Sequence, residues 1–303
     1  MSRNKNARKK RDPETARIDS VTHDGKGIAA VAGKKVFVPG ALEGETVVFQ
    51  RRKRRKNYDE AQLLEVLEHS AARIEPRCAA FGVCGGCTLQ HLSADDQRTI
   101  KERALRDNLQ RIGQVEPGRW LKSLFADGET GGWSYRRRAR LAVKDVPAKG
   151  RVLVGFREAH TPYVCDMHRC EVLSAPVGGL IDPLSDLVGR LSIRARLPQI
   201  EVAVADNVTE LVFRVLDPPS PEDLVALSEF AAAHAVQISL QTGGPGTVTP
   251  LGQVARVEKL HYSLPEFDVE IEFEPTDFVQ VNGAVNRLMV STAIRHLDVS
   301  AEH

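Results

Sequence analysis

Three cysteines in one short, Gly-rich segment constrain this chain more than any other feature of its sequence. The segment runs from Cys78 through Cys84 to Cys87, in a C-x5-C-x2-C spacing. Two cysteines separated by two residues can reach one metal centre from a single turn, and thiolates suit zinc or iron–sulfur clusters. Gly85 and Gly86 allow the positive φ values and the close backbone approach that such a turn needs. The segment is therefore predicted to be a metal-binding loop.

A fourth ligand is expected from a distant part of the chain, because such centres normally take four thiolates. The two remaining cysteines are Cys165 and Cys170, and either could complete the site. A disulfide framework is disfavoured, since five cysteines are an odd number and a chain of 303 residues does not need staples. Ordinary buried cysteines would not explain the tight grouping. Spacing alone leaves zinc and iron–sulfur open.

Positive charge is concentrated at the N-terminal end. Residues 1–60 hold sixteen Lys and Arg against eight Asp and Glu, although the net charge of the chain is +2. Residues 1–13 are predicted to be a disordered basic arm that is attracted to phosphate, with a solvated tail as the alternative. No run approaches the roughly twenty apolar residues of a membrane span, and no apolar segment follows the basic start. We therefore expect a cytoplasmic protein with no membrane partner.

Residues 14–70 are predicted to form a small, five-stranded, OB-like β-barrel. Runs rich in β-forming residues alternate with turns at Asp24-Gly25, Ala32-Gly33 and Glu43-Gly44. Six adjacent cations fall at the tip between the last two strands and repel one another unless an anion lies opposite. RNA is the predicted partner, and a solvated loop is the alternative. The six residues are Arg51, Arg52, Lys53, Arg54, Arg55 and Lys56.

The rest of the chain has the mixed pattern of an α+β fold. A helix capped by Ser93 is predicted to end at Gly113, and others are predicted at about 177–190, after Ser220 and after Asn282. Strands are predicted at SYRRRARLAV, VLVGFR, TPYVCDM, IEVAVAD, TELVFRVL, VQISLQT and FDVEIEFE. Alternation in the first of these places Arg136, Arg138 and Arg140 on one face.

Taken together and in this order, these segments resemble the RNA uracil-C5 methyltransferases, most closely the 23S ribosomal RNA branch with an N-terminal TRAM domain. DGKGIA and GKKVFVPGALEGE are similar to the TRAM segment, and RCAAFGVCGGCTLQHL resembles the cluster loop of the family. SYRRRARL and FVQVN match two later motifs. The match covers nearly the whole chain. A TRAM segment alone would also fit methylthiotransferases or small archaeal RNA-binding proteins.

The resemblance implies cofactors and site residues. In this family the metal centre is a [4Fe–4S] cluster, and the segment HRCEVL favours Cys170 over Cys165 as its fourth ligand. The glutamine at the position of Gln280 lines the S-adenosylmethionine site near the flipped uridine. Arg136 and Arg138 of the SYRRRARL motif are predicted to contact RNA. The implied metal ligands are Cys78, Cys84, Cys87 and Cys170.

The resemblance also implies a mechanism. A thiolate adds to C6 of a flipped-out uracil, and C5 attacks the methyl group of the cofactor. A general base then removes the C5 proton, and the thiolate leaves C6. The Rossmann-like cofactor domain, the nucleophilic cysteine and the base are expected beyond His303, so this chain is expected to hold no catalytic residue and to be an inactive N-terminal fragment. Whether the cluster acts as a structural clamp or as a redox sensor is left open.

The expected organisation follows from the same resemblance. The expected protein is a monomer that acts on 23S ribosomal RNA. The alternative is a non-catalytic, metal-clamped RNA-binding protein. The predicted domains are a basic arm (1–13), a TRAM barrel (14–70), a cluster loop with a helix (71–130), a central α+β domain (131–280) and the start of a methyltransferase domain (281–303).

Overall fold

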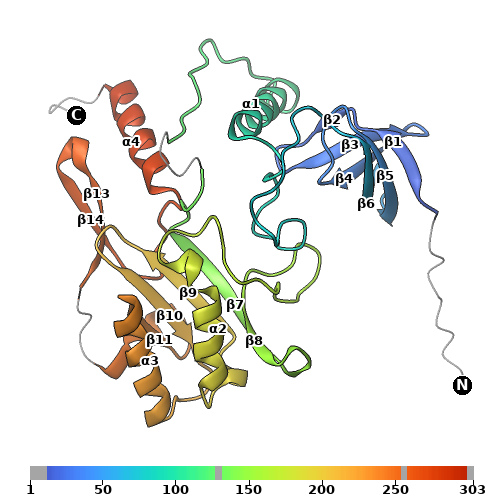
Figure 1. Cartoon of the computed structure of the whole chain (residues 1–303). Helices are drawn as coiled ribbons and strands as arrows, with labels where there is room; N and C mark the ends of the chain where they lie inside the picture. The colour runs from blue at the N-terminus through green and yellow to red at the C-terminus, as the bar shows by residue number, and fades with distance from the viewer. Residues whose placement is uncertain (1–11, 127–131, 254–257, 299–303) are drawn as a thin grey trace, which may run out of the picture. The chain divides into compact units, whose positions relative to one another are not determined.

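The computed structural model of the chain describes residues 12–126, 132–253 and 258–298 (Figure 1). The chain divides into two compact units. The first unit comprises residues 1–77 and 87–123, and the second comprises residues 78–86 and 124–303. All but the last two residues of the predicted basic arm lie outside the described residues. In the described ranges, no helix is both long and apolar enough to cross a membrane.

The first unit is built on a six-stranded sheet, where five strands were predicted. The strands follow the order β1-β5-β6-β4-β3-β2, and β4 and β6 are parallel while the other neighbours are antiparallel. The predicted turns are confirmed, and Gly25, Gly33 and Gly44 all have positive φ. The strands are β1 (Glu14–Arg17), β2 (Ser20–Val21), β3 (Lys26–Val31), β4 (Lys34–Pro39), β5 (Thr46–Arg54) and β6 (Tyr58–Glu68).

The core of the first unit comes from alternate residues of these strands, which point to one side of the sheet. Val36, Val47 and Phe49 are fully buried there. A second apolar cluster includes Leu89 and Leu92, and the partly buried Ile100 of α1 (Ala94–Arg111) packs against it. The Ser93 side chain accepts a hydrogen bond from the amide of Asp96, so the predicted start of this helix is confirmed.

The second unit contains another six-stranded sheet, with the order β12-β11-β10-β9-β7-β8. β10 and β11 are parallel because α3 (Pro221–His234) connects them, and the other neighbours are antiparallel. In Figure 1, α2 (Ile181–Arg190) and α3 lie on the same face of this sheet. The strands are β7 (Arg138–Val146), β8 (Arg151–Gly155), β9 (Gln199–Val204), β10 (Thr209–Arg214), β11 (Gln237–Gln241) and β12 (Val248–Pro250).

A β-hairpin and a final helix complete the second unit. β13 (Leu260–Leu264) pairs with β14 (Val269–Phe273), and α4 (Gly283–Leu297) follows. Asn282 caps α4 through a hydrogen bond from the amide of Val285, and Ser220 caps α3 in a capping box. Both predicted helix starts are confirmed, since a short polar side chain satisfies amides that lack a helical partner. The mixed α+β architecture is confirmed as well.

Two sequence-based predictions about this unit are wrong. The segment TPYVCDM forms no strand and makes only the single bridge from Val164 to Arg157. Pro162 has no amide to donate to a ladder, and the amide of Tyr163 is used by the Thr161 hydroxyl, so the segment bends. The helix expected from Val177 begins as a 3-10 turn over Val177–Gly179, and the α-helix starts only at Ile181. Two adjacent glycines have low helix propensity, which explains the delay.

Candidate functional site

The cysteine loop packs against residues 156–165 within the second unit. The amide of Gly85 donates to the carbonyl of Arg157 (2.8 Å), and the amide of Ala159 donates to the carbonyl of Val83 (2.9 Å). A Cβ atom on Gly85 would lie 3.0 Å from the Arg157 carbonyl oxygen, which confirms the predicted close approach. The predicted positive φ is wrong for Gly85 and Gly86, since it occurs at Gly82 instead.

The structure brings Cys165 next to this loop. Cys84 and Cys165 are both buried, and their thiols are hydrogen-bonded. Burial raises the pKa of the Cys165 thiol, and the nearby Glu158 and Cys78 raise it further, whereas the bond with Cys84 lowers it. The thiol of Cys165 is therefore kept in its neutral form.

The four predicted metal ligands are divided between the two units of the chain. Cys84 and Cys170 are buried, Cys78 is half-buried, and Cys87 is the residue at which the chain returns to the first unit. Within the described parts of the chain, no three His, Cys, Asp or Glu side chains form a group that could hold a metal ion. The donor chemistry fits zinc or an iron–sulfur cluster, but the geometry does not display the site. The four-thiolate centre therefore stays a prediction.

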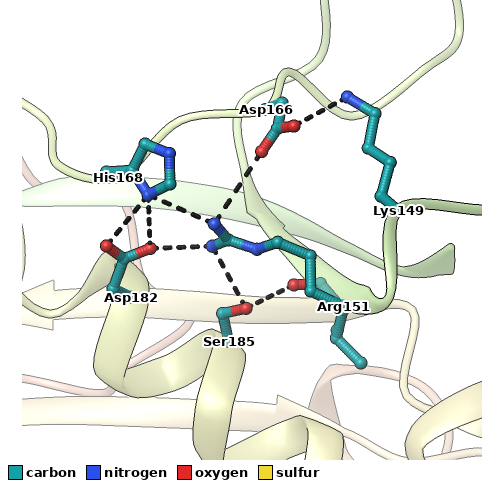
Figure 2. A network of polar contacts seen from close by, with 7 residues as sticks. Lys149, Arg151, Asp166, His168, Asp182 and Ser185 are labelled. Atoms are coloured by element: carbon teal, nitrogen blue, oxygen red, sulfur yellow. Dashed lines mark hydrogen bonds and ion pairs between the residues drawn. The ribbon is translucent and has the colours of Figure 1, made fainter.

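A polar network fixes the segment that leads into Cys170 (Figure 2). Arg151 lies at its centre and donates to Asp182 (2.7 Å) and to the hydroxyl of Ser185 (3.2 Å). His168 lies 3.0 Å from the Asp182 carboxylate, and Lys149 donates to Asp166 (2.7 Å). Burial would raise the pKa of Asp182, but hydrogen bonds from Arg151 and His168 lower it below its usual range. The network ties residues 166–168 to β8 and α2.

One extended segment, residues 134–138, contacts the Cys170 segment on one side and the FVQVN motif on the other. The amide of Arg136 donates to the carbonyl of Val172 (2.8 Å), and the amide of Ser174 donates to the carbonyl of Arg136 (2.9 Å). On the other side, the amide of Arg137 donates to the carbonyl of Val281 (2.8 Å), next to Gln280. The predicted cofactor residue and the predicted fourth thiolate thus lie near one shared piece of backbone. Gln280 itself is exposed.

The two arginines of this segment that are predicted to contact RNA are half-buried. Both also interact with other groups of the protein. The Arg136 guanidinium lies 5.3 Å from the centre of the Phe156 ring and donates to the carbonyl of Arg138 (3.0 Å). Burial lowers the pKa of Arg138, and the Nη1 atom of that residue has no hydrogen-bond partner among the described residues. Their role in RNA binding stays a prediction.

The basic tip in the first unit, which we define as residues 52–56, comprises the end of β5 and the start of the turn to β6. All five of its residues are exposed, whereas Arg51 is buried. Arg51 forms ion pairs with Asp59 (2.5 Å) and Glu14 (2.8 Å), so two carboxylates already occupy its guanidinium. Arg51 therefore anchors the base of the hairpin, and the basic tip alone presents its cations to solvent.

Asp59 is expected to stabilise this hairpin in a pH-dependent way. Its side chain is 1% exposed and accepts from Lys34 and Arg51. Burial would raise its pKa, but these hydrogen bonds lower it to about 2. Because the unfolded carboxyl titrates near 4, the contribution of about 2 kcal/mol is complete above that pH and is lost as the pH falls toward 2. Asp59→Asn should therefore lower the urea midpoint at pH 7 and 5 but have little effect at pH 2. An equal difference at all three pH values would contradict this assignment.

Sequence reasoning missed the residues that hold these segments together. One of them is Asp206, in the turn between β9 and β10, which binds Arg137 and Arg287. Asp182 plays a similar part beside the Cys170 segment. Each is a single acidic residue far in sequence from its partners, so no local pattern marks it.

The chain is similar in sequence to curated proteins of known name. No family model matches it. It is 46% identical over 281 residues to a 23S rRNA (uracil(1939)-C(5))-methyltransferase, RlmD, of Aromatoleum aromaticum, covering 93% of this chain and 64% of the relative. It is 47% identical over 286 residues to the protein of that name from Bordetella avium, covering 94% and 59%. The chain thus spans slightly less than two thirds of the length of these relatives.

A solved structure shows the same fold. The tRNA (uracil-54, C5)-methyltransferase of Pyrococcus abyssi, in complex with S-adenosyl-L-homocysteine, matches with a TM-score of 0.66 at 20% identity, covering 93% of this chain and 64% of that one. The chain is therefore similar to members of the RNA uracil-C5 methyltransferase family over nearly its whole length. Within that family, the relatives described above are the 23S ribosomal RNA enzymes.

Proposed function

We propose that this chain is part of an enzyme that methylates C5 of a uridine in 23S ribosomal RNA, with S-adenosylmethionine as the methyl donor. The observation that supports the proposal most directly is the identity of 46–47% over nearly the whole chain to 23S rRNA uracil-C5 methyltransferases. The basic tip and the exposed Gln280 give the chain groups suited to phosphate and to a polar cofactor.

The first unit is proposed to hold RNA. Five exposed cations on a short hairpin turn form a compact positive surface, and its sheet is proposed to be a TRAM-like RNA-binding module. Contacts with phosphates position an RNA without reading its sequence. The choice of uridine must then come from other contacts with bases.

The second unit is proposed to help hold the cofactor. S-Adenosylmethionine supplies the methyl group when it is bound. The amide of Gln280 can both donate and accept, which suits a polar cofactor or the edge of a flipped base. The backbone bond from Arg137 to Val281 fixes the chain directly after Gln280. The residues of this chain therefore position the reactants, and none of them is proposed as the nucleophile or the base.

The cysteines are proposed to bind a [4Fe–4S] cluster through Cys78, Cys84, Cys87 and Cys170. Three of the four lie in one loop, and the burial of Cys84 and Cys170 would protect a cluster from solvent. Transfer of a methyl group to uracil needs no electron transfer, so the proposed role is a structural clamp. No step of the reaction is assigned to the cluster.

A methylation assay tests the proposed function. The complete gene product is incubated with radiolabelled S-adenosylmethionine and with ribosomal RNA from cells that lack the gene, and the RNA is then digested to nucleosides. The expected product is 5-methyluridine in 23S RNA, and none in RNA from wild-type cells, whose site is already modified. RNA binding without any methyl transfer would instead favour the non-catalytic RNA-binding protein.

A further inference from the structure

The carboxylate of Asp206 is shared between two guanidinium groups. Its Oδ1 atom accepts from Arg137, and its Oδ2 atom accepts from Arg287 of α4 (2.6 Å). The amide of Ser263, in β13, donates to the same Oδ2 atom (2.9 Å). One side chain therefore joins the turn between β9 and β10 to three other segments of the second unit.

Arg137 connects this carboxylate to the FVQVN motif. Its amide donates to the carbonyl of Val281, and its carbonyl accepts from the amide of Val204 (2.9 Å). A Cβ atom on Gly283 would lie 2.5 Å from Nη1 of Arg137, so the guanidinium lies directly over the first residue of α4. A side chain at this position would have to displace the Arg137 guanidinium. The position of Arg137 thus defines where the chain leaves Gln280 and enters α4.

Arg287 connects the same carboxylate to the body of α4. Its Nε atom donates to the carbonyl of Ser263 (3.0 Å), so the guanidinium holds β13 as well as Asp206. Arg287 also lines a cavity of about 480 Å³ between α4 and the turn at residues 265–267. The two arginines therefore hold the first turn and the second turn of α4 to one acidic group.

The charge on Asp206 keeps two like charges together. Burial would raise the pKa of this carboxyl, but the Ser263 amide and the two guanidiniums hold it below its usual range, so the group is ionised at neutral pH. The Arg137 side chain is only 12% exposed, so water screens it poorly. If the carboxylate were neutral, the two guanidiniums would repel one another across a short distance. Loss of this one charge should therefore move the start of α4 away from residue 137.

We propose that Asp206 is a positioning residue for the cofactor site, because its carboxylate holds Arg137 and Arg287 so that Gln280 keeps the orientation needed to bind S-adenosylmethionine. This inference rests on the proposed function. Asp206 lies outside the FVQVN motif and would act on the cofactor site through Arg137 and Arg287. The proposed role of Asp206 requires no direct contact with the cofactor.

Binding measurements on the complete gene product test the inference. Asp206→Asn should weaken S-adenosylhomocysteine binding, measured by calorimetry, by about tenfold, since small displacements of a binding group have large effects. The affinity for ribosomal RNA should change less than twofold. Asp217→Asn is the matched control, because it removes an exposed ion pair with Arg196 beside the same sheet. It should leave the cofactor affinity unchanged.

A double variant separates positioning from general stability. In Asp206→Asn, the added change Arg287→Gln removes one of the two repelling charges and should recover part of the cofactor affinity. Arg287→Gln alone should weaken binding by only about threefold, because the pair between Arg137 and Asp206 remains. A lower melting temperature with unchanged cofactor affinity in Asp206→Asn, or no recovery in the double variant, would overturn the inference. A wild-type protein that does not bind S-adenosylhomocysteine would instead remove the proposed cofactor function.

Discussion

Replacing Cys84 or Cys170 with serine is expected to abolish iron binding, whereas Cys165→Ser should retain it. A [4Fe–4S] cluster needs a thiolate on each iron, and a serine hydroxyl is a poor substitute at neutral pH. The measurement is iron and sulfide content, together with the visible absorbance, of protein purified without oxygen. The Cys84→Ser and Cys170→Ser variants are expected to lose nearly all of their iron. The Cys165→Ser variant is expected to keep its full iron content.

Cys165→Ser is a demanding control, because Cys165 is buried and its thiol is hydrogen-bonded to Cys84. If proximity to the loop decided the ligand, this variant would lose the cluster. Full iron in Cys170→Ser would contradict the assignment of the fourth ligand, and loss of iron in Cys165→Ser would transfer that role to Cys165. Zinc without iron in the wild-type protein would show that the centre is a structural zinc site.

Local sequence signals correctly predicted the starts of three helices and the positions of three turns. Ser93, Ser220 and Asn282 each cap a helix, as expected, because capping depends on one side chain and the amides two or three residues ahead. The turns at Gly25, Gly33 and Gly44 are equally local, since each depends on the backbone freedom of one residue. Neither kind of signal needs information from distant parts of the chain.

Interactions between distant segments were not predictable from these patterns. The strand expected at TPYVCDM had suitable side chains, but Pro162 prevented regular pairing and a bend resulted. The role of Asp206 depends on Arg137 and Arg287, which lie 69 and 81 residues away in the chain. The run of six cations also looked uniform in sequence. The structure separates Arg51, which is buried between two carboxylates, from the exposed residues 52–56.

Because Arg51 is buried, only the exposed residues 52–56 are expected to contribute positive charge to RNA binding. Replacing Arg52, Lys53, Arg54, Arg55 and Lys56 with glutamine should lower the affinity for ribosomal RNA by at least about tenfold at low salt. The slope of log K against log salt should also become shallower, by roughly 0.7 to 0.9 for each phosphate that the protein no longer neutralises, because fewer counterions are released on binding. The measurement is a titration of labelled RNA at several salt concentrations.

Arg51→Gln distinguishes a charge that binds RNA from one that supports the hairpin. Because its guanidinium is buried against Glu14 and Asp59, this variant should be less stable but should keep the wild-type salt slope. Replacing Arg194 and Arg196 in the second unit with glutamine controls for the loss of exposed positive charge in general. Both arginines are paired with acidic residues, so this variant should keep the wild-type salt slope. An unchanged slope in the variant of the basic tip would exclude this hairpin from the RNA interface. A reduced slope in Arg51→Gln would mean that RNA displaces the carboxylates, so that the ion pairs open on binding.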